Sequence, residues 1–129
     1  MSRIRSLLKD LVPPVLVRVL RRAPRPAPKA SSSAPTEQQV SGGPLKGARL
    51  LLDLNMPAYR AMQDGSYDDF VWPALPSSTD VRGMVLDIGA HIGYDTLAFA
   101  RLYPDQRVLA FEPNPVNLER IRANFDLNP

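Results

Sequence analysis

The sequence predicts an α/β fold, and the order and composition of four segments carry that prediction. Apolar strand-like runs at residues 83–89 and 107–112 alternate with helix-forming segments at 94–103 and 115–125. Continuous apolar strands separated by helices are typical of parallel strands that are buried on both faces and joined by right-handed crossovers. We therefore expect the first half of a doubly wound, Rossmann-like parallel sheet.

Shorter elements are expected on the N-terminal side of this unit. Residues 48–54 form an apolar run that predicts one more strand. Asn55 is predicted to cap a helix that has Pro57 in its first turn, runs to about Gln63 and ends at Gly65. Residues 67–75 predict a helical turn or short helix before Pro76. In the last helix, Asn114 is the expected cap and Pro115 the first helical residue.

The first 44 residues are expected to lie outside the α/β domain. Residues 1–22 predict a basic, amphipathic helical arm that is broken at Pro13-Pro14. Residues 23–44 are rich in Pro, Ser and Ala and predict a disordered linker. The predicted organisation is therefore an arm over 1–22, a linker over 23–44 and the N-terminal half of a longer domain over 45–129.

Charge is distributed unevenly between these parts. Residues 1–30 carry eight basic side chains and one acidic side chain, whereas the remaining residues carry eight basic and twelve acidic ones. Because the predicted domain is mildly acidic, we expect no nucleic-acid partner. The arm is expected to dock on its own domain or fray, and contact with an anionic membrane surface is the less favoured alternative.

Composition excludes several classes of site and sorting signal. With no cysteine, the chain has no disulfide, zinc–thiolate site or cysteine nucleophile, and with one histidine it has no histidine-rich metal site. We therefore expect no metal. No uninterrupted apolar run reaches the roughly 18–20 residues of a membrane span, and Arg21-Arg22-Ala-Pro is a poor signal-peptide cleavage site. These observations predict a cytoplasmic protein.

The most informative motif is Asp87-Ile-Gly89-Ala-His91-Ile-Gly93, between a predicted strand and a predicted helix. Glycines at such a position allow a sharp turn and a close approach of a ligand to the backbone. The helix N-terminus offers unpaired N–H groups to a carboxylate, and Asp87 can neutralise an ammonium group. S-adenosylmethionine carries both groups at its methionine end.

Glu112 completes the motif at the end of the next strand, 19 residues after Gly93. In nucleoside-binding folds an acid at this place accepts hydrogen bonds from both ribose hydroxyls. A nicotinamide site would use the spacing G-x-G-x-x-G, whereas this loop has G-x-x-x-G with an acid two residues before its first glycine. Both features favour S-adenosylmethionine as the cofactor.

The stretch VLDIGAHIGYDTLAFARLYPDQRVLAFEPNPVNLERIRANFDLN resembles the start of the FkbM family of S-adenosylmethionine-dependent methyltransferases, and YRAMQDGSYDD is similar to the family's upstream segment. The resemblance implies a class I methyltransferase fold. It implies Asp87, Gly89 and Gly93 around the methionine end of the cofactor and Glu112 at its ribose. His91 replaces the family's usual asparagine, and either contacts the cofactor or stabilises the loop. Tyr94 and Thr96 are further candidates for the pocket wall.

The predicted function is methyl transfer to a small molecule. The resemblance suggests O-methylation of a sugar, lipid or secondary metabolite, while no residue of the chain identifies the acceptor or a catalytic base. The family fold has about seven strands, so we expect this chain to be a truncated part that is catalytically incompetent alone. The alternative is a non-catalytic nucleoside-binding or interaction module. The oligomeric state is not predicted.

Overall fold

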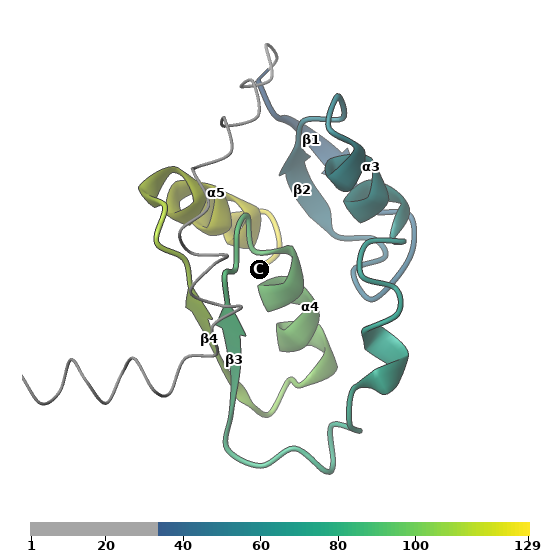
Figure 1. Ribbon diagram of the computed structural model, residues 1–129, viewed down its shortest axis with the longest axis vertical. Coiled ribbons are helices and arrows are strands. Elements are labelled where there is room, and N and C mark those ends of the chain that lie inside the picture. Colours follow the sequence, from purple (N-terminus) through teal and green to yellow (C-terminus); the bar gives the residue numbers. More distant parts are fainter. Residues whose placement is uncertain (1–33) are drawn as a thin grey trace, which may run out of the picture. The chain divides into compact units, whose positions relative to one another are not determined.

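The computed structural model describes residues 34–129. The predicted basic arm and the linker up to residue 33 lie outside the described residues. Figure 1 shows the elements in chain order. They are β1 (Thr36–Gln39), β2 (Arg49–Leu52), α3 (Pro57–Asp64), the 3₁₀ turn η1 (Trp72–Ala74), β3 (Met84–Ile88), α4 (Tyr94–Leu102), β4 (Arg107–Phe111) and α5 (Pro115–Asp126).

The predicted strand–helix–strand–helix unit is confirmed. β3 and β4 pair in parallel, with a register that runs from Met84 opposite Arg107 to Ile88 opposite Phe111. α4 connects the two strands and packs against both. Asn114 caps α5 as expected, because its side chain accepts a hydrogen bond from the N–H of Val116. The α/β class is therefore confirmed, whereas the doubly wound sheet stays a prediction, since this sheet has two strands within residues 34–129.

The upstream strand belongs to a second sheet. β2 pairs antiparallel with β1, from Thr36 opposite Leu52 to Gln39 opposite Arg49. The prediction of a disordered linker over 23–44 is wrong for its last part, since β1 lies within it. The physical reason is burial: Val40 and Leu45, which lie in the connection between β1 and β2, are 1% and 0% exposed.

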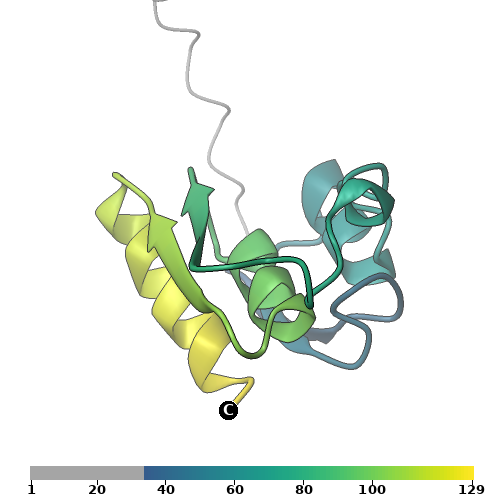
Figure 2. The same ribbon diagram turned by 90° about the horizontal axis from the view of Figure 1, so that it is seen from below.

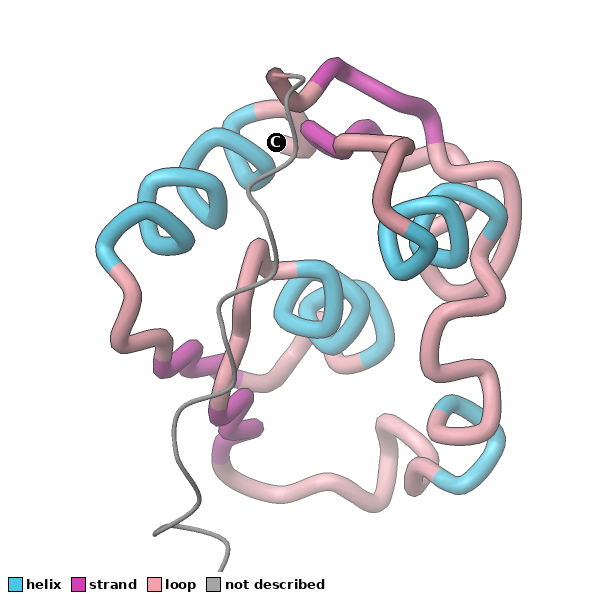
Figure 3. The backbone as a smooth tube through the Cα atoms, turned by 45° about the horizontal axis from the view of Figure 1, so that its top comes forward, coloured by secondary structure: helices cyan, strands magenta, loops and turns pink. Residues whose placement is uncertain are grey.

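One apolar core packs the hairpin and α3 against α4. Its members come from the hairpin, α3, the loop before α4, and α4 itself, and Figures 2 and 3 show α4 between the two pairs of strands. The core residues are Val40, Leu45, Ala48, Leu50, Leu52, Tyr59, Met62, Ile92, Tyr94, Leu97 and Ala98.

The predicted cap of α3 is wrong, while its predicted end is confirmed. The N-cap residue is Met56, without a side-chain hydrogen bond, and the amide of Asn55 instead donates to Asp53 Oδ1 at 2.9 Å. The helix ends at Gly65, whose φ of 86° lies in the left-handed region that glycine tolerates.

The two faces of the parallel sheet differ in solvent exposure. Val85 and Asp87 lie on the face that α4 covers, whereas the alternate side chains Met84, Leu86 and Ile88 are 54%, 51% and 81% exposed. The expectation of strands buried on both faces is therefore wrong for one face, because no element of residues 34–129 covers it.

Candidate functional site

The loop between β3 and α4 turns sharply through three residues with positive φ. Gly89, His91 and Gly93 have φ values of 93°, 51° and 86°. The N–H groups of Gly89 and Ala90 both donate to the carbonyl of Phe111, at 2.8 and 3.1 Å, so the end of β4 holds the start of the loop. At its other end, a Cβ added to Gly93 would lie 3.3 Å from the side chain of Ile121 on α5.

Glu112 holds the middle of this loop. Its Oε2 accepts a hydrogen bond from the N–H of His91 at 2.8 Å, and its Oε1 accepts one from the N–H of Asn114 at 2.8 Å. The bond from Asn114, together with the one from His91, lowers the pKa of Glu112 although slight burial opposes them. The ionised carboxylate of Glu112 thus joins the end of β4 to the loop of residues 89–93, which we call the glycine loop.

A pocket of about 620 Å³ lies at the carboxyl ends of β3 and β4. Its walls are mostly apolar, with Ile88, Phe111 and Leu118 among them, and Gly89 and Glu112 also line it. Small-molecule sites in proteins have about 300–1,000 Å³ and combine apolar walls with a few polar groups. This pocket lies at the carboxyl ends of parallel strands, where open α/β sheets bind ligands.

Asp87 lies beneath the loop and is not among the residues that line the pocket. It is 8% exposed, and its Oδ2 accepts a hydrogen bond from the Thr96 hydroxyl on α4. Thr96 is itself buried and is engaged with Asp87. This pair ties the end of β3 to the first turns of α4, and so fixes the helix N-terminus relative to the glycine loop.

His91 contacts the side chain of Tyr59, a residue that the sequence did not single out as part of the site. Its ring stacks on Tyr59 of α3 with 5.8 Å between ring centroids, and its Nε2 lies 3.4 Å from the Tyr59 hydroxyl. Arg120 of α5 donates to the same hydroxyl at 3.2 Å. Burial lowers the pKa of His91, and Glu112 and Arg120 act on it in opposite directions. No local motif marks Tyr59 or Arg120, because both reach His91 only through the tertiary fold.

Tyr94 and Asp95 begin α4, where Tyr94 is buried and Asp95 is partly buried. Tyr94 is 1% exposed and packs edge-on against Tyr67 at 5.5 Å, so it belongs to the core and not to the pocket wall. Within residues 34–129, neither the Tyr94 hydroxyl nor Asp95 Oδ1 has a hydrogen-bond partner. Burial, followed by the charges of Asp68 and Asp87, raises the pKa of Asp95 to about 6. Asp95 is a perturbed acid that sequence reasoning missed.

Residues 34–129 contain neither a cluster of metal ligands nor a membrane-spanning helix. No group of three or more histidine, cysteine, aspartate or glutamate side chains there is arranged to hold a metal ion. None of the helices in that part of the chain has the length and apolar composition needed to cross a membrane.

Comparison with known proteins identifies one class of similar enzyme. The chain is 41% identical over 54 residues to the methyltransferase sdnD of Sordaria araneosa. The match covers 42% of this chain and 19% of that protein, so it spans about a fifth of the relative's length. No model of a known protein family matches the chain. No solved structure matches it either. The similarity supports a methyltransferase.

Proposed function

We propose that this chain supplies the cofactor-binding part of an S-adenosylmethionine-dependent methyltransferase. The observation that carries the proposal is Glu112, a carboxylate that ends β4, lines the pocket and accepts the N–H of His91 in the glycine loop. An acid and a glycine loop at neighbouring strand ends are what a nucleoside with a charged tail requires. The partial similarity to a methyltransferase supports the same assignment.

The chemistry of the pocket fits the two halves of this cofactor. Each Glu112 oxygen already accepts one N–H, and a carboxylate oxygen has a further lone pair for a ribose hydroxyl. The apolar side chains of Ile88, Phe111 and Leu118 offer contact area to an adenine ring. In our proposal, the methionine end lies along Gly89, His91 and Gly93, with the charge of Asp87 beneath it.

The bound cofactor would supply an electrophilic methyl group, and the residues of this chain would align and shield it. Displacement at a sulfonium carbon depends mainly on alignment and exclusion of water. In our proposal the reaction is an O-methylation of a sugar, lipid or secondary metabolite, which the resemblance to the FkbM family supports. We assign the acceptor and any base to parts of the enzyme other than this pocket, since Glu112 is the one ionisable residue within 34–129 that lines it.

Calorimetric titration of the full 129-residue chain with S-adenosylmethionine tests the proposal. We expect Glu112→Ala to weaken binding about ten- to a hundredfold, because it removes a charge-assisted hydrogen bond of about 1.5–3 kcal/mol. Glu119→Ala, an exposed acid on α5, is the matched control and leaves the affinity unchanged. A wild-type chain that does not bind S-adenosylmethionine, or an unchanged affinity in Glu112→Ala, contradicts the assignment.

A second candidate is a nucleoside-binding module without catalysis. Among the residues that the structure describes, Glu112 is the single ionisable group of the pocket wall, and this favours the second candidate. This module would bind the cofactor and its demethylated product with the same dependence on Glu112. An assay that contains this chain, a labelled cofactor and candidate acceptors distinguishes the two proposals. Transfer of the labelled methyl group to an acceptor supports the enzyme over the binding module.

A further inference from the structure

We propose that Asn124 of α5 is a positioning residue that holds the glycine loop in its ligand-binding conformation. The inference concerns the structure of the loop first, and its consequence for S-adenosylmethionine rests on the proposed function. Asn124 is 0% exposed, although asparagine is mostly found at protein surfaces. A buried amide of this kind is retained when each of its polar atoms has a partner.

The Asn124 side chain joins the loop to the N-terminal hairpin. Its Nδ2 donates to the carbonyl of Ile92 at 2.8 Å, and its Oδ1 accepts the N–H of Leu51 on β2 at 2.8 Å. Ile92 lies within the loop, between His91 and Gly93, and is itself 0% exposed. One amide therefore links three segments that are far apart in the sequence.

The loop has a physical need for this contact. His91 is not a glycine and has a φ of 51°, a conformation that is uncommon for residues with a Cβ and persists when surrounding contacts fix it. Two side chains fix it from neighbouring residues: Glu112 accepts the N–H of His91, and Asn124 donates to the carbonyl of Ile92. When a ligand binds to Glu112, the hydrogen bond from Asn124 to the carbonyl of Ile92 can still hold the loop.

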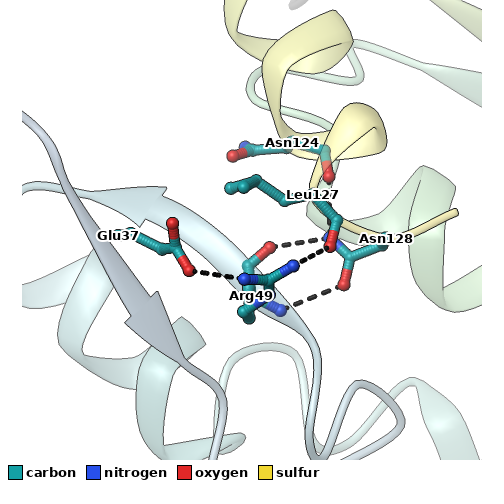
Figure 4. A network of polar contacts seen from close by, with 5 residues as sticks. All are labelled: Glu37, Arg49, Asn124, Leu127 and Asn128. Carbon is teal, nitrogen blue, oxygen red and sulfur yellow. Dashed lines mark hydrogen bonds and ion pairs between the residues drawn. The ribbon is translucent and has the colours of Figure 1, made fainter.

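A neighbouring asparagine makes a comparable attachment that does not touch the loop. Figure 4 shows Asn128 beside Arg49, to which it is bonded twice: Asn128 Oδ1 accepts the Arg49 N–H at 3.0 Å, and its Nδ2 donates to the Arg49 carbonyl at 2.7 Å. Arg49 also pairs with Glu37 at 3.1 Å and donates to the carbonyl of Leu127 at 3.3 Å. Asn128 Nδ2 also donates to the backbone carbonyl of Asn124 at 2.7 Å. Since Asn128 fastens the end of α5 to the hairpin without bonding to the loop, it is a matched control.

Amide hydrogen exchange of residues 89–93 in the full chain tests the proposal without any ligand. Asn124→Asp keeps an acceptor for Leu51 but places an oxygen against the carbonyl of Ile92. We expect exchange in the loop to accelerate at least about tenfold, the effect of losing one buried hydrogen bond. Asn128→Ala is expected to leave loop exchange unchanged. If Asn124→Asp does not fold, Asn124→Ser, which is smaller and uncharged, gives the same comparison.

Cofactor titration of the same variants separates this inference from the proposed function. We expect Asn124→Asp or Asn124→Ser to weaken S-adenosylmethionine binding about tenfold and Asn128→Ala to leave it unchanged. Loop exchange that is unchanged in a folded Asn124 variant, or equally accelerated in Asn128→Ala, overturns the positioning role. If the wild-type chain does not bind the cofactor, the proposed function fails, while the exchange data still decide whether Asn124 positions the loop.

Discussion

Individual acids in this chain have opposite environments. Glu112 lies near the surface, and backbone N–H groups from Asn114 and His91 favour its ionised form. Asp95 is partly buried, and this burial together with the charges of Asp68 and Asp87 favours its protonated form. Glu112 is therefore ionised at neutral pH and can accept hydrogen bonds from a ligand. Ionisation of Asp95, in contrast, lowers the free energy of unfolding.

We predict that Asp95→Asn stabilises the protein at pH 7.5. The pKa of Asp95 is raised from 3.8 to about 6 on folding, so its folded form binds more protons, and stability falls as the pH rises from about 4 to about 6. Removing the charge is expected to raise the free energy of unfolding by about 1–3 kcal/mol at pH 7.5.

Urea denaturation at two pH values checks this prediction. Below about pH 3 the acid is protonated in both states, so the gain from Asp95→Asn disappears there. Asp105→Asn, in an exposed turn, is the control and changes stability at neither pH. An equal gain at both pH values would mean that the raised pKa is not the cause.

At the scale of elements, the sequence predicted those parts of the fold whose signals are local. The alternation of β3, α4, β4 and α5, the cap at Asn114 and the glycine end of α3 each follow from nearby residues. β1 was missed because Thr36–Gln39 is polar and its partner strand, not its own pattern, makes it a strand. The predicted cap at Asn55 is wrong because the helix begins at Pro57, which makes Met56 the N-cap residue and leaves Asn55 one residue outside the cap.

Close packing of the β1–β2 hairpin turn against the end of α3 predicts a contrast between two glycines with the same conformation. Gly65 and Gly47 have φ values of 86° and 85°, but a Cβ on Gly65 would lie 2.1 Å from the backbone of Gly42, whereas one on Gly47 meets nothing within 4 Å. We expect Gly47→Ala to cost about 1–2 kcal/mol for its left-handed backbone alone, and Gly65→Ala to cost clearly more. Chemical denaturation of both variants measures the difference, and equal costs would contradict the predicted overlap.

At the scale of the whole molecule, residues 34–129 combine a buried apolar core with one exposed face of the parallel sheet. This exposed face, which carries Met84, Leu86 and Ile88, is called the bare face. The site could be predicted in outline, since Glu112, Gly89, His91 and Gly93 lie together. Asp87 lies beneath them with Thr96. Tyr59, Arg120 and Asn124 could not be predicted, because their contacts with the loop depend on how α3, α5 and the hairpin pack. The bare face could not be predicted either, since apolar strands indicate burial without saying what covers them.

The bare face is expected to bind the hydrophobic dye ANS. Met84 and Leu86 are about half exposed, and contiguous apolar patches of this kind bind apolar molecules. We predict that the double variant Met84→Thr, Leu86→Thr lowers ANS fluorescence strongly and leaves cofactor affinity unchanged, because neither residue lines the pocket. Phe70→Ser, at an exposed residue outside the sheet, serves as the control with little effect. Unaltered fluorescence in the double variant would place the apolar surface elsewhere.

The most direct measurement is a crystal structure of the full chain with S-adenosylmethionine. We predict that both ribose hydroxyls lie within about 3 Å of the Glu112 carboxylate and that the methionine end follows Gly89, His91 and Gly93. Cofactor bound at any other surface, with the pocket beside Glu112 empty, would contradict the assignment of this site.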